Sequence, residues 1–328
     1  MSGTKDHGAK SLIAIQASDI LGVGKIGVAL IEAISAGIGK WWEPKHYHRV
    51  GEAERLNFRN WVAEVQQAGL SSSHADLTLS ERALIRLTAN EMHRQSNREG
   101  VASSAIECFK QEVSPSSNGP IEAEPPKIDI EWLDQFWRLA QDVSNEDMQT
   151  VWGRILSRQA AGTGSYSART LHTLSMLSKS EASLLEKMAT VTISGLPDGI
   201  DAIMTHFHFG FQNYATKQAD DQLTLAAGIL NTALFGSIGI LIESGWAHGI
   251  HVTSQDPALL KIGAKKFEIR GTSKLAKPPH LLPIGSGYAY APVGKEIISL
   301  VRTVPNNDYL QSMRDGLKLV GLDLGQVE

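Results

Sequence analysis

The stretch from Trp132 to Met188 constrains the fold most, because helix caps, apolar spacing and loop glycines agree along its length. Asp129 is placed to cap a first helix, and Ser144 with Asp147 three residues later is placed to start a second. Apolar residues recur at helical spacing in both: Trp132, Phe136, Leu139 and Val143, then Met148, Val151, Trp152, Ile155 and Leu156. The pattern predicts amphipathic helices that each bury one side.

The same block contains further stop and start signals. Gly162 and Gly164 predict the end of the second helix, and Ser165 or Ser167 can cap a third. Ser178 with Glu181 forms a further capping box before Leu184, Leu185 and Met188. We therefore expect a central helical core over residues 128–190, a layout that describes packing rather than chemistry.

Composition limits the class of protein. With 42% hydrophobic and 20% charged residues among 328, the chain is typical of a globular protein of two or three modest domains. A net charge of -4 gives no global sign of nucleic-acid binding, so any basic surface must be local. The single cysteine, Cys108, excludes an intramolecular disulfide and a Cys-based zinc cage, and it suits a reducing cytoplasm.

Residues 1–10 are polar and no cleavage pattern follows an apolar segment, so no signal peptide is expected. A run of about eighteen uncharged apolar residues is also missing, which argues against a conventional spanning helix. We expect a cytoplasmic protein, with peripheral association at the inner membrane as a further option.

Residues 11–42 carry apolar side chains on one broad side, and Ala29, Ala33 and Gly37 form a small-residue ladder. Three interpretations stay open: a helix buried against the rest of the chain, a self-associating helix, or a helix that lies in a membrane surface. The residues assigned to self-association or membrane contact are Ile26, Ala29, Leu30, Ala33, Ile34, Gly37, Trp41 and Trp42.

The middle of the chain predicts two helical stretches and a linker. Residues 49–69 predict an amphipathic helix, and Thr78 with Glu81 predicts the start of a long helix that Gly100 bends or splits. Residues 114–127, rich in Ser, Pro and Glu, predict an exposed linker. The residues of the long helix expected to be buried are Leu84, Leu87, Val101, Ala105 and Phe109.

Beyond Met188 the sequence predicts a mixed module. Short strands are expected within 189–211, and residues 220–246 predict two helices, the second ending at Ser244 and Gly245. The extended segments 249–254, 265–271 and 286–291 follow, and then helices at Val293–Val301 and from Asn307 or Asp308 to Val320. This order resembles a winged helix, a likeness of fold that says little about function.

The expected fold class is therefore mainly α, with a central helical bundle and a C-terminal α+β winged-helix-like module. The expected parts are an amphipathic Gly-rich N-terminal helix (1–48), a helical region (49–113), a linker (114–127), the core (128–190) and the C-terminal module (191–328).

The chain also resembles a known family. The block WLDQFWRLAQDVSNEDMQTVWGRIL followed by GSYSARTLHTLSMLS is similar to the bacterial proteins of domain of unknown function 2806. HRQSNREGVASSAIE, LIEAISAGIGKWWEPKHYHRVGEAE and GYAYAPVGKEIISLV resemble other stretches of that family. The resemblance implies no activity and no catalytic residues. Related small helical proteins with glycine-rich N-termini occur in abortive-infection and anti-phage systems, so the resemblance implies defence by association.

Motifs for small-molecule chemistry are weak, and no cofactor is expected. Gly22, Gly24 and Gly27 spell G-x-G-x-x-G, but neither a strand before them nor a βαβ unit after them is predicted. The histidine pairs at 46/48, 206/208 and 248/251 have no accompanying carboxylate or HExxH pattern, so no metal site is assigned. Arg154 and Arg169 are a candidate anion site, although arginines of this kind more often pair with helix carboxylates such as Asp142, Glu146 or Asp147.

A basic run in the C-terminal module is the candidate nucleic-acid contact, because lysines on a wing can follow phosphates. The ordinary alternative is a solvated hairpin whose lysines protect an exposed sheet edge. The residues concerned are Lys261, Lys265, Lys266, Arg270 and Lys274.

Taken together, the sequence predicts a non-enzymatic interaction or effector protein that assembles with copies of itself or with a protein partner, with its N-terminal helix at a membrane surface. The first alternative is a nucleic-acid-binding regulator that uses the lysine-rich wing. The second is a metal-dependent enzyme with a histidine site.

Overall fold

The computed structural model describes residues 24–39, 60, 78–112, 127–195, 199–206, 232–250, 257–272, 282–301, 303–319 and 321–327. Its contacts divide the chain into unit 1, Met1–Ser175, and unit 2, Met176–Glu328. Each unit is described by itself. The fold is mainly α, as expected, with a seven-stranded antiparallel sheet in unit 2.

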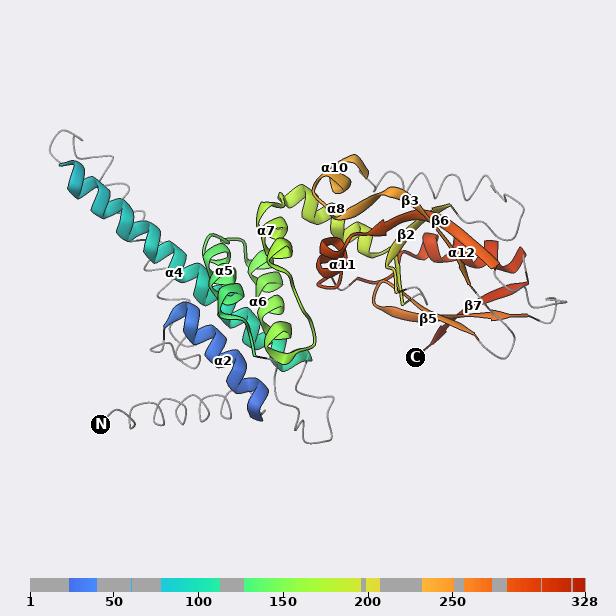
Figure 1. Cartoon of the computed structure of the whole chain (residues 1–328), viewed down its shortest axis with the longest axis horizontal. Helices are drawn as coiled ribbons and strands as arrows, with labels where there is room; N and C mark the ends of the chain where they lie inside the picture. The colour runs from blue at the N-terminus through green and yellow to red at the C-terminus, as the bar shows by residue number, and fades with distance from the viewer. Residues whose placement is uncertain are drawn as a thin grey trace. The chain divides into compact units, whose positions relative to one another are not determined.

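Unit 1 is a helical bundle (Figure 1). Its helices are α2 (Gly24–Ile38), α4 (Leu79–Glu112), α5 (Ile130–Ala140), α6 (Glu146–Ala161) and α7 (Ala168–Met176). Most of the predicted caps are confirmed. The Asp129 carboxylate accepts from the Trp132 amide at the start of α5, and Gly162 takes the left-handed conformation (φ 69°) that ends α6.

The cap of α6 differs from the prediction. Asn145, not Ser144, accepts the hydrogen bond from the Met148 amide. Ser144 is unsuitable because its hydroxyl is engaged by His93 and Asn97 of α4. At α7 the Ser167 hydroxyl accepts from the Thr170 amide, so the second of the two expected serines is the one used.

Helix α2 is part of the core of unit 1. Leu30 and Ile34 are fully buried, and the Trp137 indole Nε1 donates to the Ala33 carbonyl at 3.0 Å. Gly37 lies directly against the Trp137 ring: a Cβ added there would be 2.1 Å from it. Of the three interpretations of this segment, burial against the rest of the chain is confirmed for residues 24–38. The small-residue ladder serves close packing within one chain.

Helices α4 and α6 pack closely over the inner half of α4. A Cβ at Gly153 would lie 2.6 Å from the Ala105 backbone nitrogen, so only glycine permits this approach. A Cβ at Gly100 would lie 2.3 Å from the Gln149 amide oxygen, so that side chain would have to move. Since α4 runs unbroken from Leu79 to Glu112, the predicted bend or split at Gly100 is wrong. That glycine provides room for a neighbour rather than a hinge.

The predicted buried side of α4 is correct for its inner half and wrong for its outer half. Val101, Ala105 and Phe109 are fully buried, whereas Leu84 and Leu87 are 63% and 65% exposed. The reason is length. At about 1.5 Å per residue, α4 is roughly twice as long as the 16-residue α6, so its first turns extend past the partner that buries its last ones (Figure 1).

Unit 2 is a sheet with helices packed on it. The strands are β1 (Thr192–Ser194), β2 (Ala202–His206), β3 (Leu241–Ile250), β4 (Ala258–Ile262), β5 (Lys265–Gly271), β6 (Leu282–Tyr290) and β7 (Leu322–Val327). The helices are α8 (Lys179–Ala189), α10 (Thr232–Ser237), α11 (Pro292–Ile298) and α12 (Asn307–Leu319). Neighbouring strands are antiparallel in the order β3-β6-β2-β1-β4-β5-β7, and the core of unit 2 includes Met188, Ile193, Phe235, Phe267, Met313 and Leu324.

The structure confirms one prediction for unit 2 and differs from two others. The capping box of Ser178 and Glu181 is confirmed at α8, which lies in unit 2 rather than with the central core. The second helix predicted within 220–246 is wrong: α10 ends at Ser237, Gly239 adopts a left-handed conformation (φ 75°), and Leu241–Ile250 is a strand. The sheet has seven strands, and the likeness to a winged helix is not confirmed.

Candidate functional site

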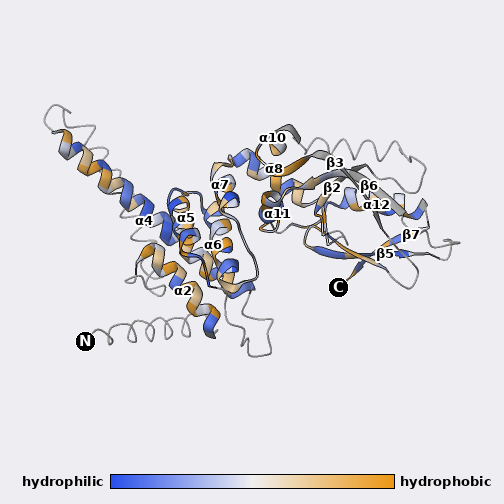
Figure 2. Cartoon of the chain, viewed as in Figure 1, coloured by the Kyte–Doolittle hydropathy of each residue, from blue (hydrophilic) through white to orange (hydrophobic). Residues whose placement is uncertain are grey.

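The outer half of α4 exposes large apolar side chains. Leu84, Ile85, Leu87 and Met92, together called the α4 ridge, are all solvent-exposed, as is Leu79 at the helix start. Figure 2 shows hydrophobic positions among hydrophilic ones on the part of α4 that extends beyond the bundle. Exposed apolar residues are ordinary when scattered singly, but a contiguous group is typical of an interaction surface.

Helical spacing gathers the α4 ridge on one broad side. At about 100° per residue, its four members fall within an arc of roughly 160°. Arg82 and Arg86, which are also exposed, fall on the opposite side of the helix. The same arc also contains the exposed Thr88 and Glu91, so the ridge is an apolar strip with polar positions in it, and no described residue of unit 1 buries it.

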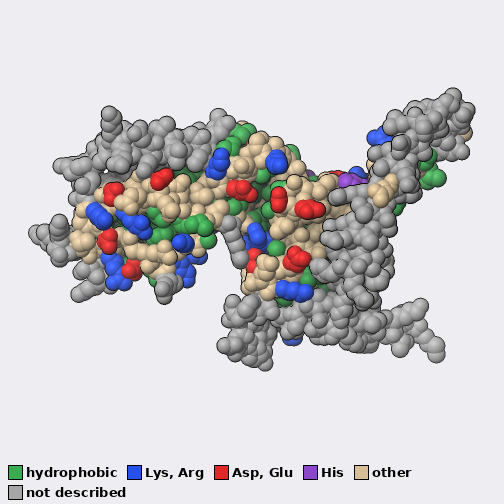
Figure 3. All heavy atoms as spheres, turned by 180° about the vertical axis from the view of Figure 1, so that it is seen from behind, with side chains coloured by type: hydrophobic (Ala, Val, Ile, Leu, Met, Phe, Trp, Pro, Cys, Tyr) green, Lys and Arg blue, Asp and Glu red, His purple; other side chains and the backbone are tan. Residues whose placement is uncertain are grey.

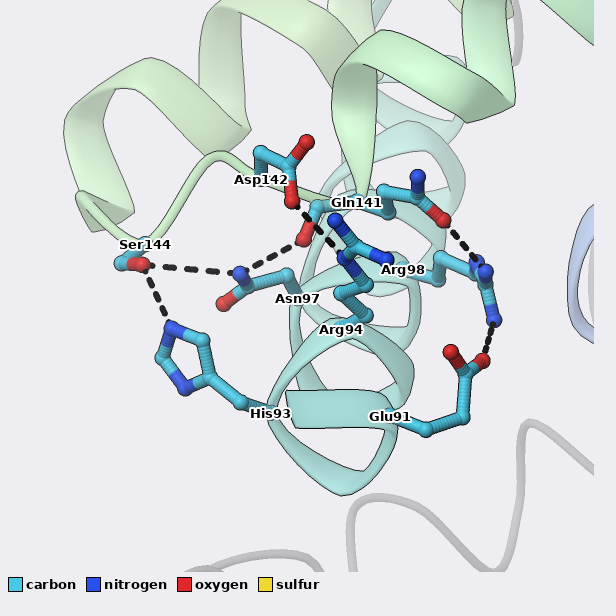
Figure 4. Close-up of polar contacts among 8 residues, drawn as sticks. All are labelled: Glu91, His93, Arg94, Asn97, Arg98, Gln141, Asp142 and Ser144. Atoms are coloured by element: carbon cyan, nitrogen blue, oxygen red, sulfur yellow. Dashed lines mark hydrogen bonds and ion pairs between the residues drawn. The ribbon is translucent and has the colours of Figure 1, made fainter. Parts of the chain in front are cut away.

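The α4 ridge begins where α4 extends beyond the bundle. At that position a network of polar side chains joins α4 to the loop between α5 and α6 (Figure 4). The buried Asn97 side chain donates to the Gln141 carbonyl at 2.8 Å and lies 3.4 Å from the Ser144 hydroxyl. Gln149, also buried, donates to the Val143 carbonyl at 2.8 Å. Both amides satisfy backbone groups of the loop between α5 and α6, so Asn97 fixes the loop to α4 and Gln149 fixes it to α6.

The exposed part of the same network is weaker. Arg94 pairs with Asp142 at 3.0 Å, and Arg98 contacts both Glu91 and Gln141. Exposed ion pairs of this kind stabilise by about 0–1 kcal/mol, whereas a buried group left without its partner costs about 1–3 kcal/mol. The buried amides are therefore what orient α4, and with it the α4 ridge, relative to the bundle.

One contact in the network has the atoms of a nucleophile and a base. His93 Nε2 lies 2.9 Å from the Ser144 hydroxyl. Within the described residues, however, no carboxylate meets the other ring nitrogen, and Asp142 is engaged by Arg94. A serine nucleophile needs a histidine that is itself oriented by a third group. The contact between His93 and Ser144 therefore has a structural role: it joins α4 to the loop between α5 and α6.

The two arginines of the candidate anion site are not brought together by any described contact. Arg154 pairs with Glu112 at 3.2 Å, and the same carboxylate takes Arg158 at 2.9 Å. Burial alone would lower the pKa of Arg158, but its hydrogen bonds to Glu112 and Tyr166 outweigh this and raise that pKa. Arg169 lies in the first turn of α7. Glu112 replaces the partners expected from the sequence because α4 ends beside α6.

Cys108 has the setting expected of an inert thiol. It is buried on α4, and desolvation raises the pKa of its thiol, an effect that the nearby Arg154 partly opposes. A thiol with a raised pKa stays protonated at neutral pH and is a poor nucleophile.

The remaining sequence candidates are placed only in part. His46, His48, His208, His251, Trp41, Trp42 and Lys274 lie outside the described residues. Within the described residues, no group of three or more His, Cys, Asp or Glu side chains could hold a metal ion, and no helix is long and apolar enough to cross a membrane. Lys261, Lys265 and Lys266 are exposed on β4 and β5, whereas Arg270 is paired with Glu268 at 2.6 Å.

Comparison with known proteins identifies the family. The model of the family described as "Protein of unknown function (DUF2806)" matches residues 81–314, from the outer half of α4 to α12. The chain belongs to this family. The resemblance seen in the sequence is thereby confirmed for the stretches within residues 81–314, and the DUF2806 match includes the α4 ridge, the polar network and all strands of the sheet except β7. No curated protein and no solved structure matches the chain.

Sequence reasoning missed the α4 ridge, since it assigned Leu84 and Leu87 to the core. The signal that would have found the site is the length of the helix. A helix of 34 residues needs neighbours along its whole length to bury its apolar residues, and the sequence predicts no helix of that length inside the bundle.

Proposed function

We propose that this DUF2806 protein is a non-enzymatic interaction protein that assembles with a second copy of itself through the α4 ridge. The observation that carries the proposal is the exposure of Leu84, Ile85, Leu87 and Met92 on one side of a helix that extends beyond its bundle. Apolar surface in this arrangement is stabilised when another apolar helix side covers it.

A second copy is the partner that best fits this surface. Two copies related by a twofold axis bring identical ridges together, so apolar side chains of one copy pack against those of the other and the assembly closes as a dimer. The basic side of each helix, with Arg82 and Arg86, then stays in water. The buried network around Asn97 supports this role, because a ridge held in a fixed orientation loses less conformational entropy on association.

The proposal places assembly on α4 rather than on α2. Ile26, Leu30, Ala33 and Ile34, which the sequence analysis assigned to self-association or membrane contact, are buried within unit 1. A membrane role for the same side chains would require α2 to leave that core. A role in anti-phage defence rests on the resemblance alone, and we propose it as the setting of the assembly.

Light scattering on the full chain tests the proposal. The wild-type protein should have twice the mass of one chain, and the double variant Leu84→Glu/Leu87→Glu should have the mass of a single chain with unchanged helix content. Leu259→Glu is the matched control, because Leu259 is 62% exposed but lies on β4. A wild-type monomer, or a ridge variant that keeps the wild-type mass, would rule the α4 ridge out as the assembly surface.

A further inference from the structure

A second surface lies in unit 2 and is independent of the α4 ridge. We infer that the exposed face of β4 and β5 binds nucleic acid through the phosphodiester backbone, using Lys261 and Lys266, without recognition of bases. The register of β4 and β5, which the amino-acid sequence alone does not show, brings these lysines together.

The register places two lysines directly opposite each other. Lys261 of β4 pairs with Lys266 of β5, and both side chains are exposed. Directly opposed residues of an antiparallel pair have Cβ atoms about 5 Å apart, and like charges there are destabilising. Lys265, one residue before Lys266, is also exposed but points to the other face of the sheet, since its register partner is the buried Ile262. The sheet therefore concentrates positive charge at this end of the hairpin.

The charge is uncompensated at this end of the strands and compensated at the other. Arg270, also on β5, makes a bidentate pair with Glu268 at 2.6 and 2.9 Å, and its register partner on β7 is Asp323. Within the described residues, no carboxylate forms an ion pair with Lys261, Lys265 or Lys266. Figure 3 shows Lys and Arg side chains gathered with a few acidic ones over unit 2, at the left of the view.

Edge protection does not explain these lysines. Lysines often blunt an open sheet edge, but β4 lies between β1 and β5, and β5 lies between β4 and β7. Both strands are therefore inside the sheet, and Lys261 and Lys266 stand on its open face. The opposite face of the same strands carries the buried Leu260, Ile262, Phe267 and Ile269.

The hairpin that carries the lysines is held in place. Its turn contains Gly263 at φ +56°, where an added Cβ would lie 2.9 Å from the Thr303 carbonyl. The Ala264 amide donates to the same carbonyl at 2.9 Å, and the Gly263 amide donates to the Thr192 carbonyl at 3.2 Å. The positions of the lysine backbones are thus fixed before a ligand arrives, which lowers the entropy cost of binding.

A nucleic-acid backbone fits this surface better than a bilayer does. Lysines are point charges that bind phosphate without selecting a base, and the described outward positions of β4 and β5 carry no aromatic ring on which a base could stack. A lipid bilayer is a broad surface and would meet Glu268 and Asp323 on the same face together with the lysines. A strand of phosphodiesters can instead contact the lysine end alone.

The experiment measures binding of full-length protein to a labelled 20-base-pair DNA duplex by fluorescence anisotropy. Two phosphate contacts predict a slope of about -1.8 for log affinity against log salt, or a loss of about 12-fold between 50 and 200 mM salt. Lys261→Gln/Lys266→Gln should reduce this slope to near zero and weaken binding at 50 mM salt more than tenfold. The same variant should unfold at no lower temperature than wild type, since it removes a like-charge pair.

Lys187→Gln/Lys318→Gln is the control, because both lysines are exposed in unit 2 and the variant has the same net charge. It should bind like wild type. Equal losses in the two variants, wild-type binding by the Lys261/Lys266 variant, or no duplex binding at 50 mM salt would each overturn the inference. Binding of wild type to phosphatidylserine vesicles without binding to the duplex would overturn the choice of nucleic acid. Leu84→Glu/Leu87→Glu should still bind the duplex, so this inference and the proposed assembly fail separately.

Discussion

The indole ring of Trp137 occupies the space that a side chain at Gly37 would need. A Cβ at Gly37 would lie 2.1 Å from the ring, and the ring nitrogen is hydrogen-bonded to the Ala33 carbonyl. Gly37→Ala should therefore destabilise unit 1 by about 1–3 kcal/mol, the usual cost of overpacking a core. Urea unfolding measures this loss. Ala36→Val, at an exposed position of the same helix, is the control and should cost less than 1 kcal/mol.

Deletion of residues 1–45 tests the role of α2 directly. Because Leu30, Ile31 and Ile34 are almost fully buried in unit 1, the truncated protein should lose several kcal/mol of stability. A truncation that unfolds with the wild-type midpoint would show that α2 is not a core element. Circular dichroism during thermal unfolding gives the comparison.

Asn97 should matter more than its exposed neighbour Arg94. Asn97→Ala removes a buried side chain, leaves the half-buried Gln141 carbonyl without its donor and should cost about 1–3 kcal/mol. Arg94→Ala removes an exposed pair with Asp142 and should cost less than about 1 kcal/mol. Both free energies of unfolding come from the same denaturant series. Similar losses in the two variants would contradict the view that the buried amide fixes α4.

Tyr290 makes unit 2 sensitive to alkaline pH. Burial raises the pKa of its phenol, the hydrogen bond with the Thr192 hydroxyl at 2.9 Å partly opposes this shift, and Asp201 adds to it. Since the unfolded chain loses this proton near pH 10.0 and the folded chain does so only at higher pH, the contribution to stability is complete below that pH. Above it, the free energy of unfolding should fall by up to about 1.4 kcal/mol per pH unit.

Tyr290→Phe has no proton to lose and should show a shallower alkaline fall in stability than wild type. Urea midpoints measured from about pH 9 to pH 11 for both proteins make the comparison. Identical curves would show that other groups cause the alkaline loss.

The parts of the fold that could be predicted are those fixed by near neighbours in the sequence. The caps at Asp129 and at Ser178 with Glu181 depend on residues three positions apart, and both are present. The burial of Leu84 and Leu87 could not be predicted in this way, since it depends on the length of α6, an element far along the chain. Leu84 and Leu87 do recur at helical spacing, but α6, the helix that buries the inner half of α4, is too short to reach them.

Two other differences have similar causes. The apolar segment at Leu241–Ile250 is a strand although its pattern also suits a helix, and a short apolar run does not distinguish the two. Asn145, and not Ser144, caps α6, because the Ser144 hydroxyl is hydrogen-bonded to His93 and Asn97. Both of these residues lie about fifty positions earlier in the sequence. The opposition of Lys261 and Lys266 is a matter of strand register, which composition alone does not reveal.

The most direct test of assembly through the α4 ridge follows two methionines of the same chain. Met92 belongs to the ridge and is 38% exposed, whereas Met176 is 74% exposed and lies elsewhere. Peroxide oxidation of each residue, quantified by mass spectrometry, depends on its access to solvent. The account predicts that raising the protein concentration slows oxidation of Met92 relative to that of Met176. A ratio of the two rates that stays the same from dilute to concentrated protein would contradict it.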